Sequence, residues 1–411
     1  MNIKPLPWLM LASVYITQYI GIAFIMSAAV AILRQQGVAL DKLALLNLAA
    51  IPLAGKVLYA PLIDNYRLFF HGQYRSWLLA AQAGMTCLLL LASLLDINQA
   101  FSAIFIILIA YVLCIDIQDV SIDGLACKLF DSQSHKFANS VQISGNLLGN
   151  IIGGGIILML YPWLGWQGSL LLLAGLTSIA LLQVLRYVEP HLPHQQQANE
   201  QASPLWRDLW GFVKQQQRWF AVLAIFPLGF TSGFAILNPL LVDSHWTLVD
   251  IGFATKVYGS AVGFLSALLA TLLIARLGRV KTLITLSLSQ AAGLCLMLPL
   301  TLGDTEKLSV YLAISAYFIS FPAILVTLAT IAMDKAADTV RKATFFTLQF
   351  SFVSLMGFIY SALTMALAKY LGYYKVIVFG VLTTALMSLV VYLVLYKNQR
   401  TQSDARAHDT Y

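Results

Sequence analysis

Long apolar runs separated by short polar segments dominate this chain. Each of twelve runs is long enough to cross a bilayer as a helix. In the first half they cover residues 6–33, 43–63, 76–95, 101–122, 137–160 and 166–188, and in the second half 219–242, 249–275, 282–302, 308–333, 344–367 and 374–396. The pattern therefore predicts an all-α integral membrane protein with twelve transmembrane helices.

Composition and charge agree with this prediction. Of the 411 residues, 59% are hydrophobic and 10% are charged, and the mean hydropathy of +0.79 excludes a soluble globular domain. The net charge of +7 does not indicate a nucleic-acid partner, because the basic residues punctuate the apolar runs instead of forming a patch. If the N-terminus is cytoplasmic, 18 of the 25 Lys and Arg fall in inside segments, five fall in outside loops, and Lys56 and Lys256 lie within spans. The positive-inside rule then places both termini in the cytoplasm.

The longest polar interruption, residues 189–217, separates six spans from six. It predicts two six-helix bundles, residues 1–188 and 218–397, joined by a central cytoplasmic loop, with a cytoplasmic tail at 398–411. Within the loop, apolar residues cluster on one face of a predicted helix: Leu205, Trp206, Leu209, Trp210 and Val213. We expect an amphipathic helix on the membrane surface, with a regulatory docking site as the alternative.

Three carboxylates stand out in the fourth span. Asp116, Asp119 and Asp123 are spaced i, i+3 and i+7, so a helix places them on one face. Ionised groups are costly in hydrocarbon, and such a row therefore faces a water-filled cavity or cationic partners. Because like charges repel, we expect at least one of the three to exchange protons near neutral pH, or to contact substrate. The alternative is that Asp119 and Asp123 reach headgroup water or cap the loop.

Two lysines lie inside predicted spans. Lys56 is at a depth comparable to that of Asp119, so it either forms a salt bridge with the carboxylates of the fourth span or binds an anionic substrate. Lys256 is about seven residues into the eighth span from the outside. It either extends to the outer surface or offers a cation to substrate near the outer mouth.

Other polar residues suggest a pathway and a gate. Candidates for lining a cavity are Tyr15, Gln18, Tyr19, Gln118, Gln142, Asn146, Asn150 and Asn238. Asp64 ends the second span and is followed by Arg67 and Arg75, which suits a cytoplasmic charge lock; a helix-end ion pair is the alternative. Glycines at four-residue spacing in the fifth span, Gly145, Gly149 and Gly153, predict close helix packing.

Catalytic and nucleotide-binding signatures are absent from the sequence. It contains no Walker-type glycine loop, no Gly-x-Ser-x-Gly elbow and no His-Glu-x-x-His pair. We therefore expect no enzyme activity, no cofactor, no resident metal and no direct use of ATP.

Four segments carry a family resemblance: Ala31–Gly37, Ile51–Asp64, the motif Gln118-Asp119-x3-Asp123, and Gly252 to Gly259. With the six-plus-six arrangement, the chain resembles the major facilitator superfamily, and more specifically its muropeptide-permease (AmpG)-like branch. The compact chain and the Leu33-Arg34-Gln35-Gln36-Gly37 ending are most similar to the RhtX/FptX siderophore permease group. The loop after Asp64 departs from the superfamily pattern, because it lacks the usual glycine-plus-basic run.

The resemblance implies a transporter of the bacterial inner membrane that works by alternating access. Its bundles would rock around a midplane cavity lined by spans 1, 4, 7 and 10, driven by an ion gradient, most simply protons. The expected cargo is a siderophore, an iron–siderophore or a similar anionic metabolite, imported by a monomer embedded in lipid. A muropeptide permease and a drug or siderophore exporter are the alternatives.

Overall fold

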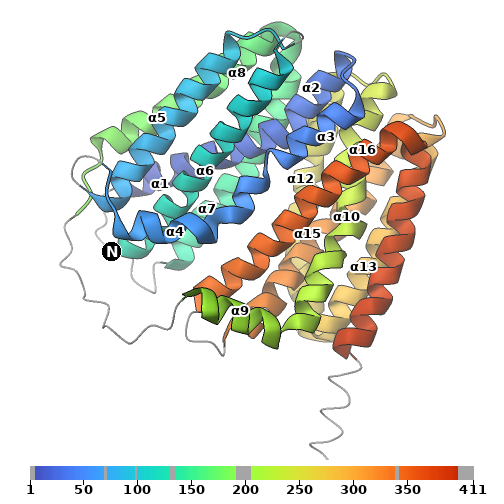
Figure 1. The fold of residues 1–411 in the computed structure, drawn as a ribbon. Helices are drawn as coiled ribbons and strands as arrows, with labels where there is room; N and C mark the ends of the chain where they lie inside the picture. The colour runs from blue at the N-terminus through green and yellow to red at the C-terminus, as the bar shows by residue number, and fades with distance from the viewer. Residues whose placement is uncertain are drawn as a thin grey trace, which may run out of the picture. The chain divides into compact units, whose positions relative to one another are not determined.

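Helices form all the regular structure in the described part of the computed structural model, which comprises residues 5–68, 72–97, 100–129, 135–190, 205–337 and 342–396 (Figure 1). The chain folds as two units. The first contains Met1–Ala198 and His245–Val257, and the second contains Asn199–Ser244 and Tyr258–Tyr411. The start of the predicted eighth span therefore packs with the first unit, although it follows the seventh span in sequence.

The first unit is built from a run of long and short helices. They are α1 (Pro5–Ala23), η1 (Phe24–Ala28), α2 (Ala29–Gln35), α3 (Leu40–Leu48), η2 (Ile51–Gly55), α4 (Lys56–Asn65), α5 (Gln73–Ser93), α6 (Phe101–Leu129), α7 (His135–Asn150), η3 (Ile151–Ile156), α8 (Ile157–Arg186) and α11 (Leu248–Gly252), with most of η4 (Phe253–Tyr258). One core cluster joins α1, α5, α6 and α8 through buried residues such as Val14, Leu78, Ile122 and Val184.

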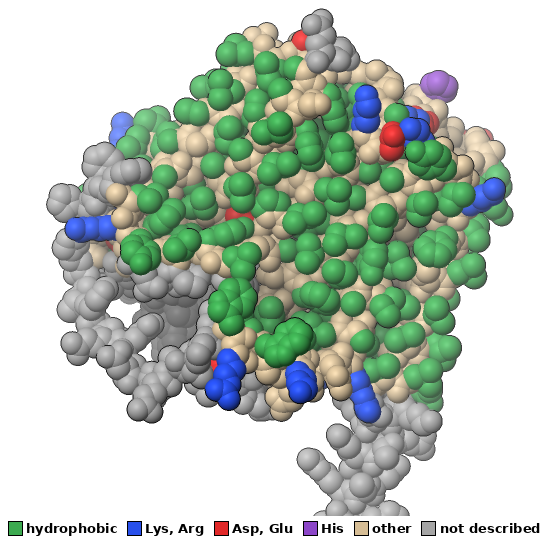
Figure 2. Space-filling view, in the orientation of Figure 1, with side chains coloured by type: hydrophobic (Ala, Val, Ile, Leu, Met, Phe, Trp, Pro, Cys, Tyr) green, Lys and Arg blue, Asp and Glu red, His purple; other side chains and the backbone are tan. Residues whose placement is uncertain are grey.

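The second unit contains the remaining elements. They are α9 (Leu205–Gln215), α10 (Gln217–Asp243), α12 (Gly259–Leu277), α13 (Arg279–Cys295), α14 (Leu298–Thr301), α15 (Lys307–Ala337), α16 (Lys342–Val391) and η5 (Tyr392–Tyr396). On this unit, the face drawn in Figure 2 is covered by hydrophobic side chains, with charged ones mostly toward its ends. Exposed leucines such as Leu272 and Leu382 suit a surface that contacts lipid.

Nine helical segments in the described residues are long and apolar enough to cross a membrane. Two of them, Ser144–Arg186 and Thr344–Val394, each contain two predicted spans. The chain reverses within them at Gly165 (φ 62°) and Gly372 (φ 77°), where the left-handed backbone favours glycine. The predicted second span is broken into α3, η2 and α4, none of which is long enough alone. All twelve predicted segments are therefore helical, and the all-α prediction is confirmed.

The break in the second span has a local cause. Pro52 is at the start of η2, and its ring nitrogen has no hydrogen to donate to a preceding carbonyl. The chain tightens to a 3-10 turn, and α4 restarts at Lys56. This restart places Lys56 and Tyr59 on the turn of α4 that meets α6.

The glycine row of the fifth span packs against α1 inside the first unit. A side chain at Gly145 would meet Tyr15, one at Gly149 would meet Tyr19 and Ile20, and one at Gly153 would clash with the Ile20 carbonyl oxygen. The predicted close packing is thus observed. Its partner is the first span.

Candidate functional site

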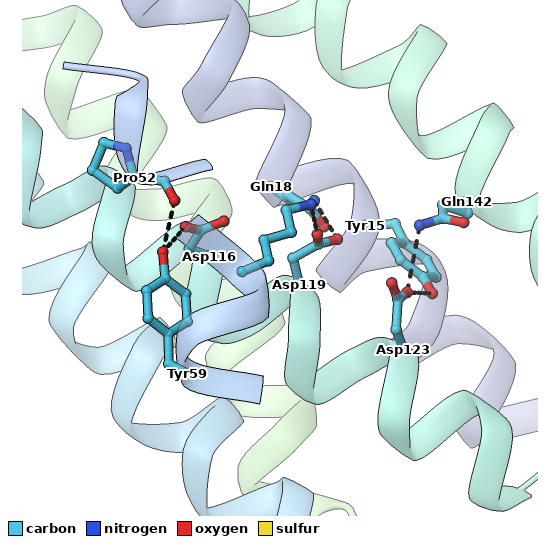
Figure 3. Close-up of polar contacts among 9 residues, drawn as sticks. Tyr15, Gln18, Pro52, Tyr59, Asp116, Asp119, Asp123 and Gln142 are labelled. Atoms are coloured by element: carbon cyan, nitrogen blue, oxygen red, sulfur yellow. Dashed lines mark hydrogen bonds and ion pairs between the residues drawn. The ribbon is translucent and has the colours of Figure 1, made fainter. Parts of the chain in front are cut away.

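A buried polar cluster lies along α6 in the first unit (Figure 3). Asp116, Asp119 and Asp123 occupy successive turns of this helix and face partners from α4, α1 and α7. We call these three residues and their hydrogen-bonding partners the α6 cluster. The helical spacing predicted that the three carboxylates share a face. The structure shows in addition that each has its own set of partners.

Asp119 is the central carboxylate and is 3% exposed. Lys56 forms a salt bridge to its Oδ2, and the Gln18 side-chain amide donates to its Oδ1 at 2.6 Å. An ammonium and an amide together satisfy both oxygens, so the negative charge of the buried Asp119 is compensated. The predicted ion pair between Lys56 and the carboxylates of the fourth span is therefore present.

Asp116 is fully buried, and its partners differ in kind. Its Oδ2 contacts the Tyr59 hydroxyl, which also lies 2.6 Å from the carbonyl oxygen of Pro52. Its Oδ1 has no hydrogen-bond partner among the described residues. Asp116 thus lacks the cationic partner that Asp119 has.

Asp123 lies nearest the end of α6 and receives hydrogen bonds from two neutral groups. The Tyr15 hydroxyl donates to its Oδ1 at 2.6 Å, and the Gln142 amide approaches the same oxygen at 3.4 Å. Tyr15 comes from α1 and Gln142 from α7, the two helices that the glycine row holds together. The sequence prediction named all three residues, and the structure brings them into one group.

Amides behind the carboxylates join three helices. The Gln118 amide donates to the Val14 carbonyl at 2.7 Å, and Gln82 donates to the Gln118 oxygen at 2.7 Å and to Thr17 at 3.2 Å. Gln118 is fully buried, so in this conformation it ties α6 to α1 and α5. The side-chain oxygens of Gln18 and Gln82 are buried without a hydrogen-bond donor among the described residues. With Asp116 Oδ1, the cluster has more acceptors than donors.

Lys256 is 6% exposed, and its stem lies along the glycines of η3. A side chain at Gly154 would come within 2.8 Å of its Cε, and one at Gly155 within 3.0 Å of its Cβ. Gly252, one turn earlier, packs against the Gly155 carbonyl in the same way. In this conformation the lysine is packed inside the first unit and does not extend along an exposed surface. Its predicted role toward an anionic substrate remains a prediction.

The other lining candidates fall into two groups. Asn146 and Asn150 bond to each other on α7, with the Asn150 amide 2.7 Å from the Asn146 side-chain oxygen, and Tyr19 contacts Asn146. Asn238 lies buried on α10 in the second unit. The candidates of the first unit therefore extend the α6 cluster along α1 and α7.

The predicted gate is only partly described. The side chain of Asp64 lies outside the described residues, and Arg67 is exposed. Arg75 reaches the carboxyl end of α8, where its guanidinium donates to the carbonyls of Val184 and Leu185 at 3.3 and 2.9 Å. These bonds give Arg75 a helix-capping role. The charge lock remains a prediction.

Three residues in or beside the α6 cluster were not predicted as site residues: Tyr59, Pro52 and Gln82. For Tyr59 a signal was available: it is three residues after Lys56, so it shares a helical face with the lysine expected to meet the carboxylates. Gln82 gave no comparable signal, since a lone amide in an apolar helix has many possible partners.

Comparison with solved structures shows the fold. The chain aligns with the crystal structure of the nucleoside transporter NupG (D323A mutant) at a TM-score of 0.71 and 13% identity, covering 95% of this chain and all of that one. It aligns with an inward-facing bacterial homologue of the human lysosomal transporter Spinster at 0.70 and 12% identity, covering 96% of this chain and 98% of that one.

Sequence comparison gives a relative and a family. The chain is 24% identical to the anhydromuropeptide permease of Escherichia coli (strain K12) over 244 residues, which is 58% of this chain and 49% of the relative. It therefore spans about half the length of that curated relative. The family model described as Major Facilitator Superfamily matches residues 11–361. The chain belongs to the Major Facilitator Superfamily.

Proposed function

We propose that this protein is a secondary active transporter that couples proton movement to the transport of a bulky solute across the bacterial inner membrane. The observation that carries the proposal is the α6 cluster. Three carboxylates are gathered within a helical bundle against one ammonium among the described side chains, Lys56, so full ionisation would leave two negative charges without a described cation. Such an excess is costly in a membrane protein, and proton uptake relieves it.

The cargo that the relatives favour is a muropeptide. The E. coli relative carries this substrate class in its name, and its similarity extends over more than half of this chain. This favours the cell-wall fragment, which the sequence analysis held as the alternative, over the siderophore. A siderophore remains the second candidate, because the Leu33–Gly37 ending resembles siderophore permeases.

Uptake into proteoliposomes tests both parts. Purified protein would be given labelled anhydromuropeptide, or a panel of iron–siderophores, with and without an inward proton gradient. We expect accumulation of one solute class that requires the gradient and is abolished by a protonophore. Asp119→Asn should lose gradient-driven accumulation. If no solute accumulates under any gradient, the proposed function is wrong, and if siderophore accumulates instead, only the cargo is wrong.

A matched variant separates proton coupling from general damage. Arg279 and Asp334 form an ion pair in the second unit, with side chains about half exposed. Asp334→Asn removes a carboxylate without touching the α6 cluster, so it should preserve gradient-driven uptake. Equal losses in Asp334→Asn and Asp119→Asn would contradict a specific role for the cluster.

A further inference from the structure

The Tyr59 hydroxyl is in contact with two acceptors at once. It lies 2.6 Å from the Pro52 carbonyl oxygen and also contacts Asp116 Oδ2 (Figure 3). A phenol has one proton to donate, and a carbonyl can only accept. If Asp116 is ionised, the two acceptors compete for that proton, and Asp116 Oδ1 is buried with no donor among the described residues. If Asp116 carries a proton, both contacts are complete hydrogen bonds.

We propose that Tyr59 is a positioning residue that links the proton on Asp116 to the break in the second span. This inference rests on the proposed function, because it describes how the same carboxylates would act on the fold. In the protonated state, the Asp116 carboxyl O–H donates to Tyr59 Oη, and the Tyr59 O–H donates to the Pro52 carbonyl. Tyr59 thereby holds η2 in place while Asp116 carries a proton.

Proton loss changes the direction of one hydrogen bond. When the acid ionises, its proton passes to solvent, and Tyr59 stays neutral. The Tyr59 O–H then turns to the Asp116 carboxylate, since a hydrogen bond to a charged acceptor is stronger than one to a carbonyl. The Pro52 carbonyl loses its donor, and η2 is released at the point where the second span is already broken.

The groups around Asp116 support the role of Tyr59 as its hydrogen-bonding partner. From α4 it faces Tyr59 and Lys56, and from its own helix Asp119. The Lys56 ammonium is bonded to Asp119, so the nearest cation is already engaged by the neighbouring carboxylate. Tyr15 and Tyr19 of α1 interact with Asp123 and Asp119, and the Gln82 amide of α5 donates to Gln118.

Hydrogen–deuterium exchange of the solute-free protein tests the link directly. Peptides that span η2 would be followed across a pH series, with rates corrected for intrinsic exchange. In the wild type we expect protection of η2 at low pH and about tenfold faster exchange at high pH, because losing one hydrogen bond changes the local opening equilibrium by about that factor. Asp116→Asn should stay protected throughout, because its amide can donate to Tyr59 as the protonated acid does. Tyr59→Phe should exchange fast throughout.

A control and an independent readout keep the test decisive. Tyr161→Phe removes a phenol of the first unit that bonds to Gln36, so η2 should behave as in the wild type. Infrared spectroscopy should show a protonated-carboxyl band that Asp116→Asn abolishes and that Tyr59→Phe shifts. No such band, or exchange of η2 that ignores pH in the wild type, would overturn the inference. If uptake is proton-driven but the exchange of η2 does not depend on pH, only this link is refuted. If the exchange of η2 depends on pH but uptake is not proton-driven, the proposed function is refuted.

Discussion

The Lys56–Asp119 pair gives a quantitative test of the α6 cluster. The Asp119 side chain is 4% exposed and that of Lys56 is 29% exposed. Removing one partner of a buried pair typically costs about 3–5 kcal/mol, because the other charge remains unpaired. The partial exposure of Lys56 and the Gln18 hydrogen bond reduce that cost here, so we expect about 2–3 kcal/mol for Lys56→Met or for Asp119→Asn alone. Removing both charges should cost less than the two single changes together.

Thermal unfolding in detergent measures this double-mutant cycle. We expect a coupling energy of about 1–3 kcal/mol, in the upper part of the range of about 0.5–3 kcal/mol found for residues in direct contact. The chain supplies its own control, since Arg279 and Asp334 form an ion pair at 2.7 Å with side chains 50% and 41% exposed. The same cycle on that pair should give about 0–1 kcal/mol, because solvent screens it. Additive losses for Lys56 and Asp119, or equal coupling in the two pairs, would refute the view that burial makes the α6 pair strong.

Three further predictions concern packing and the membrane surface. Gly153→Ala places a methyl group against the Ile20 carbonyl and should cost about 1–3 kcal/mol in thermal unfolding, while Gly175→Ala, with nothing within 4 Å, should cost nothing. Gln349→Leu removes the acceptor that the Trp219 indole reaches at 2.6 Å and should cost about 1–3 kcal/mol in the same assay; an unchanged melting temperature would contradict this. Trp210→Ala should leave stability unchanged but weaken the quenching of tryptophan fluorescence by brominated lipid, since Trp210 is 72% exposed on α9; undiminished quenching would argue against a surface helix.

The helices could be predicted from the sequence because hydrophobicity is a local property of each span. Twenty apolar residues predict a membrane helix whatever they pack against. Breaks within a span were harder to predict, since they depend on backbone hydrogen bonds. Pro52 was visible in the sequence, but proline is tolerated in membrane helices, and only the structure shows that η2 and a restarted α4 follow it.

For α9, the sequence predicted the helix and its apolar residues, but not which of those residues pack against the protein. The sequence placed Trp206, Leu209 and Trp210 on one apolar face, and a helix does form there. In the structure Leu209 is buried, together with Phe212, which stacks on Phe345, while Trp206 and Trp210 are 63% and 72% exposed. The helix thus has one apolar side toward its own unit and another outward, a division that depends on tertiary packing.

The carboxylates of the site could be predicted from the sequence, but the partner of each carboxylate could not. Helical spacing was enough to put Asp116, Asp119 and Asp123 on one face. Their partners come from three other helices, and which partner meets which acid depends on how α4 restarts after the break. The spacing therefore gave Lys56 as a partner for the row as a whole, but it contained nothing to single out Tyr59 for Asp116.

The three carboxylates are chemically equivalent in sequence, and their partners make them different. Asp119 is held by an ammonium and an amide, so its charge is compensated. Asp123 receives a phenol and an amide, and Asp116 has one phenol that it shares with a backbone carbonyl. Charge compensation thus decreases from Asp119 through Asp123 to Asp116, and Asp116 is fully buried. Both Asp116 and Asp119 contact the broken span, Asp119 through Lys56 of α4 and Asp116 through the phenol that it shares with the Pro52 carbonyl of η2. The link proposed above therefore assigns Asp116 to η2 through Tyr59, whereas Lys56 ties Asp119 to the restart of α4.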